Sequence, residues 1–175
     1  MKSQSTNLTV LSLEKYHPVV LQIINLLSEH KIWHETFTHE PVRTSEEAAS
    51  LRDGYTLQQG AKTILIRVKI SSAKKRFAML VMPGDTRFDS DKVKELFHAK
   101  DIRFATEAEV LSLTNGVQPG GVPPFGNLFG IEVIVDPTLL ENEKIIFNAG
   151  DRCFSVGMKS VDYAAIVSPR ITEIV

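Results

Sequence analysis

Cysteine and long apolar runs are scarce in this sequence of 175 residues. The one cysteine, Cys153, excludes an internal disulfide and a cysteine-based zinc site, and it fits a reducing compartment. No apolar run approaches the roughly 20 residues that span a membrane. The polar segment from Met1 to Asn7 also lacks the apolar core of a signal peptide. We therefore expect a soluble, cytoplasmic protein that has no membrane partner.

An excess charge of either sign is lacking as well. The 20 basic and 21 acidic residues give a net charge of −1, so no global field attracts nucleic acid. Any nucleic-acid partner has to be held by local contacts. Hydrophobic residues make up 43% of the chain, which is typical of globular domains and excludes disorder, collagen and disulfide scaffolds.

Apolar spacing and capping residues predict helices among short strands. Thr44 with Glu47, and Thr106 with Glu109, form capping boxes at two helix starts. Helices are predicted to begin at Pro18, Thr44, Asp89, Thr106 and Ser160. Strands are predicted over Trp33 to Thr38, Ala61 to Ile70, Phe77 to Met82, Ile131 to Val135, Ile145 to Phe147 and Cys153 to Val156.

The order of these elements favours the α+β class. Strands occur in pairs between helices without a regular βαβ alternation, which is typical of a central, mostly antiparallel sheet flanked by helices. The length fits one domain. We expect a tail and helix over residues 1–30 and the domain itself over residues 31–175.

The segment from Asn115 to Gly130 does not resemble an ordinary connector. It reads NGVQPGGVPPFGNLFG and holds five of the ten glycines and three of the eight prolines. Loops of this length are uncommon in compact domains and are usually functional or disordered. The apolar residues Val122, Phe125, Leu128 and Phe129 argue against disorder. We interpret the segment as a rigid loop whose backbone approaches a ligand.

Lys62 lies on the apolar face of its predicted strand, with Ile64, Ile66, Val68 and Ile70. A lysine in that position either snorkels to water at the strand end or points into a concave site. The stretch from Gly60 to Thr63 is not a nucleotide-phosphate loop, because that motif requires glycine directly before the lysine.

Other reactive residue types give weaker signals. His30 and His34 straddle a predicted helix end, so they share no face and predict no metal site. His39 precedes a helix and is open to a site role or to a backbone hydrogen bond. Cys153 is expected to be an inert thiol within a strand. The segment from Asn148 to Asp151 is typical of a turn between strands.

Six segments of the chain together resemble the YbaK/EbsC family, which includes the editing domain of prolyl-tRNA synthetase and its free-standing relatives. They occur in the family's order and span about residues 31 to 170. The segments are Thr44 to Ala49, Gly60 to Thr63, Met82 to Asp85, Arg103 to Thr106, Gly120 to Gly126 and Asn148 to Asp151.

The resemblance implies a hydrolase that cleaves the ester of mischarged aminoacyl-tRNA carrying a small amino acid, without metal or cofactor. The family's functional lysine falls on Lys62, and its GxxxP loop falls on Gly120 to Pro124. A positioned water, or the sulfur of a thiol substrate, is expected to attack the ester. The implied catalytic residues are Lys62, Gly120 and Gly121. The implied substrate-binding residues are His39, Thr44, Val122, Pro123, Pro124, Asn148, Gly150 and Asp151.

The expected partner is the acceptor end of aminoacyl-tRNA, delivered by a synthetase or an elongation factor. A different class of function is a non-catalytic module that binds an acceptor end, a nucleotide or a protein through the same pocket. Retention of Lys62 and of the whole GxxxP loop favours the enzyme. A Schiff-base role for Lys62 lacks any site for a cofactor phosphate.

Overall fold

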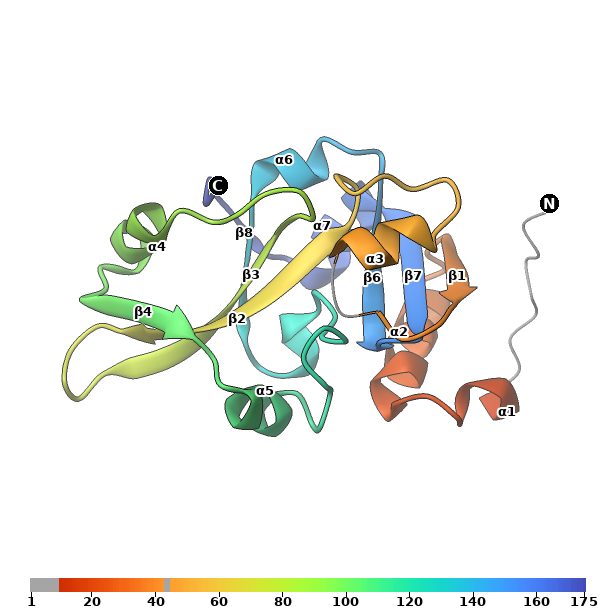
Figure 1. Cartoon of the computed structure of the whole chain (residues 1–175), viewed down its shortest axis with the longest axis horizontal. Coiled ribbons are helices and arrows are strands. Elements are labelled where there is room, and N and C mark those ends of the chain that lie inside the picture. The colour runs from red at the N-terminus through yellow and green to blue at the C-terminus, as the bar shows by residue number, and fades with distance from the viewer. Residues whose placement is uncertain (1–9, 43–44) are drawn as a thin grey trace.

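The computed structural model describes residues 10–42 and 45–175. Its strands form two sheets, which lie side by side in Figure 1. The strands are β1 (His34–Thr38), β2 (Ala61–Lys69), β3 (Lys75–Pro83), β4 (Asp101–Phe104), β5 (Glu132–Val135), β6 (Lys144–Asp151), β7 (Phe154–Lys159) and β8 (Arg170–Ile171). The helices are α1 (Val10–Leu13), α2 (Pro18–Glu29), α3 (Ser45–Ser50), α4 (Ser90–Phe97), α5 (Glu107–Leu113), α6 (Pro137–Leu140) and α7 (Ser160–Val167), with a 3₁₀ turn η1 (Gly126–Leu128).

The smaller sheet has the strand order β1-β7-β6 and is antiparallel throughout. The larger sheet has the order β4-β2-β3-β5-β8. Its β4, β2 and β3 strands are antiparallel, whereas β5 and β8 run parallel to their neighbours. The α+β class with mostly antiparallel strands is confirmed, and the strands divide between two sheets rather than one.

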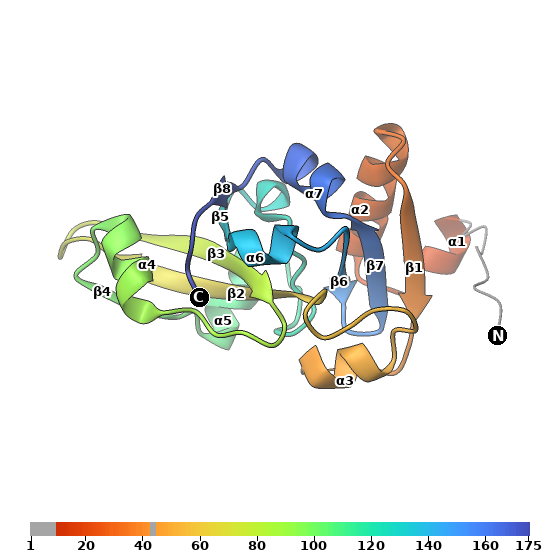
Figure 2. The same cartoon turned by 90° about the horizontal axis from the view of Figure 1, so that it is seen from above.

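The two sheets meet where β2 begins. Gly60 forms an isolated parallel bridge with Ile146 of β6, and the Ile146 amide donates to the Gln59 carbonyl at 3.0 Å. In the view from above, α3 lies across this junction between the start of β2 and the ends of β6 and β7 (Figure 2). Helix α3 therefore lies next to the junction of the two sheets.

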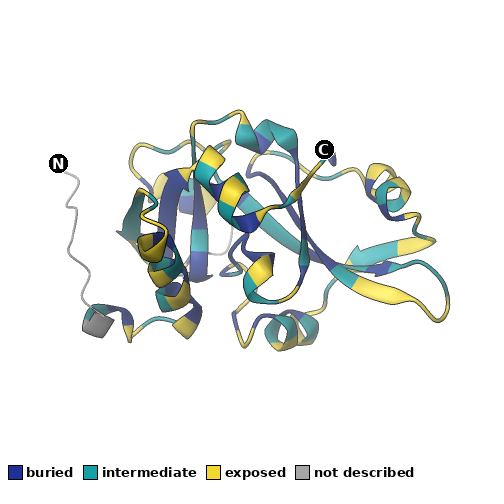
Figure 3. Ribbon diagram, turned by 180° about the vertical axis from the view of Figure 1, so that it is seen from behind, coloured by how far each residue is buried: buried dark blue, intermediate teal, exposed yellow. Residues whose placement is uncertain are grey.

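Two hydrophobic cores hold the sheets in place, and the dark strands of Figure 3 trace them. The first core packs α2 and α7 against β6 and β7, with Leu65 and Met79 from the larger sheet. The second core packs Val93 and Phe97 of α4 against the opposite face, where Ile66 is fully buried. Strand β2 therefore contributes side chains to both cores. The strand predicted over Ala61 to Ile70 is an interior strand between β4 and β3, with Ile66 buried and Ile64 half-buried.

Several predicted boundaries match the structure for identifiable reasons. Pro18 begins α2, Asp89 caps α4 through two backbone amides, and Thr106 and Glu109 form the predicted capping box. Helix α7 spans residues 160–167 as predicted, and Ser168 ends it in the left-handed conformation. The capping box at Thr44 lies outside the described residues.

Three sequence predictions need correction. Cys153 does not lie within a strand: it occupies the turn between β6 and β7, and the strand from Lys144 to Asp151 includes the segment predicted as a turn. A bulge between Asn148 and Asp151 keeps the polar residues paired within the sheet. Strand β4 was not predicted: its residues alternate between polar and apolar, but four residues give only a short pattern.

The start of α5 generates a prediction about stability and pH. The Glu109 carboxylate accepts two hydrogen bonds of 2.7 Å from Arg103 and one from the Thr106 amide, and these contacts lower the pKa of Glu109 from 4.5 to about 2. A depressed pKa stabilises the folded state above the unfolded pKa, and this stabilisation is lost as the pH falls through the folded value.

We therefore expect Glu109→Gln to lower the thermal unfolding midpoint at pH 7. The difference from wild type should shrink below about pH 4.5 and disappear near pH 2. Glu107→Gln is the matched control, because Glu107 lies exposed in the first turn of the same helix. Equal effects of the two substitutions at pH 7 would show that the Arg103 contact does not stabilise the fold.

Candidate active site

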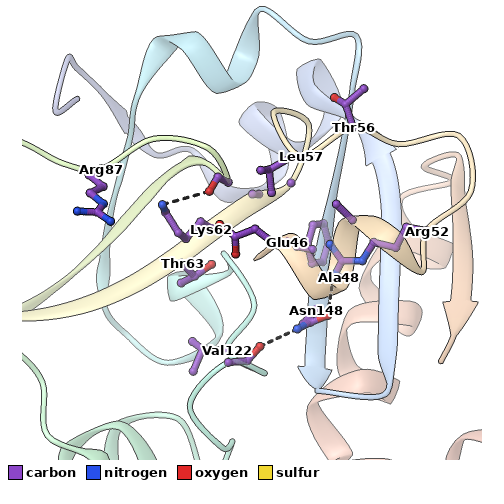
Figure 4. Close-up of a pocket in the computed structure, with 16 residues that line it drawn as sticks. Glu46, Ala48, Arg52, Thr56, Leu57, Lys62, Thr63, Arg87, Val122 and Asn148 are labelled. Atoms are coloured by element: carbon purple, nitrogen blue, oxygen red, sulfur yellow. Dashed lines mark hydrogen bonds between the residues drawn. The ribbon is translucent and has the colours of Figure 1, made fainter. Parts of the chain in front are cut away.

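A cavity of about 430 Å³ lies at the junction of the two sheets. Its walls come from α3, the start of β2, the turn after β3, the loop after α5 and the middle of β6, as Figure 4 shows. The lining residues are Glu46, Ala48, Ala49, Arg52, Thr56, Leu57, Gly60, Ala61, Lys62, Thr63, Gly84, Arg87, Gly120, Val122, Phe147 and Asn148. Three of them are cationic and one is a carboxylate, so the cavity favours an anionic ligand.

Lys62 is held at the cavity wall by main-chain carbonyl groups. Its Nζ donates to the Gly84 carbonyl at 3.3 Å and also to the Thr86 carbonyl, both in the turn that follows β3. The Thr86 amide and hydroxyl in turn donate to the Pro83 carbonyl and fix that turn. An ammonium has three hydrogens, so one remains for a ligand. Of the two alternatives for Lys62, the concave site is the one that the structure shows, and the turn after β3 fixes the ammonium there.

The groups around Lys62 have opposing effects on its pKa. Burial lowers the pKa of Lys62, and the nearby Arg87 lowers it further, whereas Glu46 and Asp85 raise it. No carboxylate of the described residues lies within ion-pair distance of its Nζ. The ammonium is therefore oriented by neutral acceptors and keeps its charge for a ligand.

Arg52 is the most deeply buried cation of the site. It is 5% exposed, and burial lowers its pKa to about 10. Its Nε donates to Ser155 Oγ at 3.0 Å and its Nη2 to Asn148 Oδ1 at 2.5 Å. A buried guanidinium without a carboxylate partner is costly unless its hydrogens are satisfied. Arg52 therefore requires the two polar side chains that β6 and β7 present.

Asn148 connects Arg52 to the glycine-rich loop through hydrogen bonds. Its Oδ1 accepts from Arg52 and from the Ser155 hydroxyl, so its Nδ2 faces the other way and donates to the Gly120 carbonyl at 2.6 Å. Gly120 has a φ of +88°, which other residues rarely adopt. The Arg52, Ser155 and Asn148 side chains therefore hold Gly120 in a conformation that its lack of a side chain permits.

The rest of the loop is anchored by buried aromatic residues. Phe125 is fully buried and packs against Phe147 and Tyr163, whose hydroxyl donates to the Pro124 carbonyl at 2.8 Å. Arg152 Nε donates to the Pro119 carbonyl at 2.8 Å from the opposite side. The predicted interpretation of a rigid loop agrees with these contacts. The amides of Gly120 and Val122 make no hydrogen bond in the described structure, so both are available to a ligand.

Thr63 presents an unpaired hydroxyl at the same cavity. Its Oγ1 is buried and has no protein hydrogen-bond partner, although the residue lines the cavity wall next to Lys62. Buried hydroxyl groups are nearly always paired, since an unpaired one costs free energy. The hydroxyl becomes a contact for a polar group of the ligand if the side chain rotates it toward the cavity.

Most of the sequence-predicted site residues line one of two cavities. Lys62, Gly120, Val122 and Asn148 line the main cavity. Gly121, Gly150 and Asp151 line a smaller cavity of about 260 Å³ behind the loop, together with Cys153. Pro123 and Pro124 are buried within the loop, and Thr44 lies outside the described residues.

Gly150 and His39 support the site from outside it. Gly150 has a φ of +102°, and a side chain there would meet Val19 of α2 at 2.8 Å. Its amide donates to the Gly121 carbonyl at 2.9 Å, so it couples β6 to the loop. His39 Nε2 lies 2.7 Å from Ser155 Oγ, and its Nδ1 contacts the Glu40 carbonyl. Burial lowers the pKa of His39.

Arg52, Thr63, Gly84 and Arg87 line the cavity but were not among the predicted site residues. Thr63 and Gly84 belong to two of the six matched segments, so the resemblance contained a signal for them. Arg52 follows α3 without any sequence feature that indicates burial. Within residues 10–42 and 45–175, no group of three or more His, Cys, Asp or Glu side chains could hold a metal ion.

A model of the aminoacyl-tRNA editing domain matches residues 39–166, a range that includes every described residue of the cavity. The chain belongs to this family. The resemblance inferred from the six segments is thus confirmed at the family level. None of the helices in the described ranges is long and apolar enough to cross a membrane.

Curated relatives and a solved structure agree with this assignment. The multifunctional Ser/Thr-tRNA deacylase ProXp-y of Escherichia coli is 31% identical over 87% of this chain and 90% of its own length. A proline–tRNA ligase of Ralstonia pickettii is 28% identical over 66% of this chain, which corresponds to 20% of the ligase. The crystal structure of a candidate trans-editing enzyme for prolyl-tRNA synthetase shares the fold. It has a TM-score of 0.75 and 21% identity, and the match covers 90% of this chain and 97% of that one.

The hydrogen-bonded network around Arg52 generates a prediction about this editing domain. We expect Arg52→Lys to lower the free energy of unfolding by about 1–3 kcal/mol, because lysine cannot donate to Ser155 and Asn148 with the fork geometry of a guanidinium. Arg67→Lys in β2 is the matched control, with an expected change within about 0.5 kcal/mol. Urea denaturation measures both. Equal stabilities of Arg52→Lys and wild type would contradict the proposed dependence on the network.

Proposed function

We propose that the chain is an aminoacyl-tRNA deacylase that hydrolyses the ester of mischarged tRNA carrying a small amino acid. The observation that carries this proposal is the Lys62 ammonium, which is oriented by carbonyls toward a cavity that also contains the free amides of the Gly120 loop. Serine and threonine are the first amino acids to test, because the Escherichia coli relative is a Ser/Thr-tRNA deacylase. The match to that relative covers 90% of its length.

The reaction needs a positioned ester and stabilisation of negative charge. Water attacks the carbonyl carbon, the carbonyl oxygen becomes an oxyanion, and the bond to the ribose oxygen then breaks. The attacking water loses one proton to solvent and the leaving oxygen takes one up, which restores the ribose hydroxyl and releases the free amino acid. Lys62 donates its remaining N–H to the developing oxyanion, and the amides of Gly120 and Val122 supply further donors. Preorganised donors of this kind need no reorganisation during the reaction.

Other residues of the cavity have distinct proposed roles. Arg87 is exposed at the cavity edge and contacts the phosphate of the terminal nucleotide. Thr63 offers its hydroxyl to a polar group of the aminoacyl moiety. Glu46 is exposed at the cavity edge, and its carboxylate faces the α-ammonium group of the substrate. Arg52 and Asn148 position the loop rather than touch the ester.

The remaining residues of the proposed site have supporting roles: His39, Thr44, Gly121, Pro123, Pro124, Gly150 and Asp151. The smaller cavity behind the loop contains Gly121, Gly150 and Asp151, so their effect on the ester is expected to act through the loop backbone. We infer that a synthetase or an elongation factor delivers the tRNA, because the net charge of −1 supplies little attraction over distance.

The central test is deacylation of purified mischarged tRNAs. We expect wild-type protein to release serine, threonine or another small amino acid from a panel of such tRNAs. Lys62→Ala should lower the rate roughly a hundredfold through loss of one positioned donor. Its unfolding midpoint should change little, because water can reach the two carbonyls at the open cavity.

Lys69→Ala is the matched control for Lys62→Ala, since Lys69 ends the same strand far from the cavity. Full activity of Lys62→Ala on every cleaved substrate would contradict the catalytic assignment. If wild type cleaves no member of the panel yet binds acceptor ends, the non-catalytic binding module becomes the better description.

The unpaired hydroxyl of Thr63 generates a separate prediction. Thr63→Val removes the hydroxyl with little change in shape. We expect kcat/KM to fall about tenfold, the size of one lost hydrogen bond to substrate. The free energy of unfolding should stay the same or rise, because an unpaired buried hydroxyl is removed. A stable variant with unchanged kinetics on all cleaved esters would show that Thr63 does not contact the substrate.

A further inference from the structure

An exposed aromatic pair lies beside the candidate active site. Phe104, the last residue of β4, is 62% exposed, and its ring contacts Phe88 edge-on with ring centroids 5.8 Å apart. Phe88 is half-buried against the second core, whereas Phe104 has no place in either core. Phe104 therefore presents most of its ring to solvent on a support that is fixed by Phe88.

The strand register places this pair on the same face as the catalytic lysine. Phe104 lies opposite Ile66 in the β2–β4 ladder, and residues directly opposite in a ladder share a face. Lys62 lies on that face of β2, four residues before Ile66. The pair is also linked to the cavity by sequence, because Phe88 directly follows Arg87, which lines the cavity. Arg87 therefore connects the cavity, which it lines, to Phe88, which contacts Phe104.

The charge beside the aromatic pair suits a nucleic acid. Arg87 is exposed and makes no hydrogen bond or ion pair in the described structure. It lies close enough to Lys62 to lower the pKa of that lysine. Proteins that hold single-stranded nucleic acids combine unpaired cations, which contact the backbone, with aromatic rings on which bases stack. The exposed ring of Phe104, with Arg87 directly before its supporting Phe88, has this composition.

We propose that Phe104, supported by Phe88, is a stacking platform for a nucleobase of the single-stranded CCA end of tRNA. This inference rests on the proposed function, which places the terminal adenosine and its ester in the cavity. The platform takes the base of a preceding nucleotide, and Arg87 contacts the phosphate between the two. Stacking on phenylalanine tolerates any base, so the platform adds affinity without reading sequence.

The distance between the two sites defines the shape of the bound strand. Four residues of a β-strand, from Lys62 to Ile66, span roughly 13 Å. Bases that remain stacked on one another are separated by only about 3.4 Å along a strand. The bound CCA end is therefore extended, and the base on Phe104 is unstacked from the terminal adenosine. Figure 1 places the end of β4 beside β2.

The experiment compares three substrates that carry the same amino acid: the complete aminoacyl-tRNA, the aminoacyl-CCA trinucleotide and aminoacyl-adenosine. We expect Phe104→Ala to raise KM for the first two by roughly 5- to 150-fold, the range expected for one stacked base. The value of kcat should stay within about twofold of wild type. KM for aminoacyl-adenosine should not change, because this substrate has no second base.

Matched variants separate stacking from a general effect on the fold. Phe104→Trp should restore the wild-type KM, since an indole ring also stacks. Ile171→Ala should leave KM unchanged for all three substrates, because Ile171 is a 51% exposed apolar residue in β8 at the other edge of the same sheet. Equal effects of Phe104→Ala on all three substrates, or none on any, would overturn the platform.

A binding measurement distinguishes failure of the platform from failure of the proposed function. A fluorescent, unacylated CCA trinucleotide is titrated with wild type and with Phe104→Ala, and anisotropy reports the affinity. Weaker binding by Phe104→Ala supports the platform even if wild type hydrolyses no ester. Equal binding of the trinucleotide by both proteins contradicts the platform whether or not wild type is a deacylase.

Discussion

The buried Arg52 guanidinium is the interaction on which the candidate active site depends. The two sheets share a hydrophobic core and are joined by a bridge between Gly60 and Ile146, and the polar side chains of Asn148 and Ser155 lie near this junction. Arg52 joins a side chain of β7 to one of β6, and Asn148 extends the connection to the loop at Gly120. A cation fixed in this way aligns three separate parts of the chain around one cavity, at the cost of its own desolvation.

The residues of the site have two different roles as a result of this arrangement. The side chains of Arg52, Ser155 and Asn148 are committed to one another and to the loop backbone. Lys62 and the amides of Gly120 and Val122 keep hydrogens that no group of the described residues accepts. Groups that support the geometry are therefore buried, and groups that are available to a ligand lie at the cavity wall. This separation is typical of preorganised sites, in which the donors are in place before the substrate arrives.

Sequence patterns could predict the parts of this fold that depend on local rules. Pro18, Asp89 and Thr106 mark helix starts by interactions within a few residues, and the alternation in β2 places Lys62 on the face of Ile66. Cys153 and the strand end before it were misassigned because turn-forming residues also occur at bulges, which depend on the partner strand. Arg52 could not be predicted, since its burial depends on two strands about a hundred residues further along the chain.

The acceptors that orient Lys62 are main-chain carbonyls, and this has a consequence for how the site tolerates mutation. A lysine held by an aspartate loses its orientation when that one side chain changes. Here a substitution at Thr86 replaces a side chain but leaves the accepting oxygen in the chain. Random substitutions can therefore disturb the orientation of Lys62 only by reshaping the turn after β3. The geometry of the ammonium is protected from most single mutations, while residues at the cavity edge remain free to change and to adjust which ester is accepted.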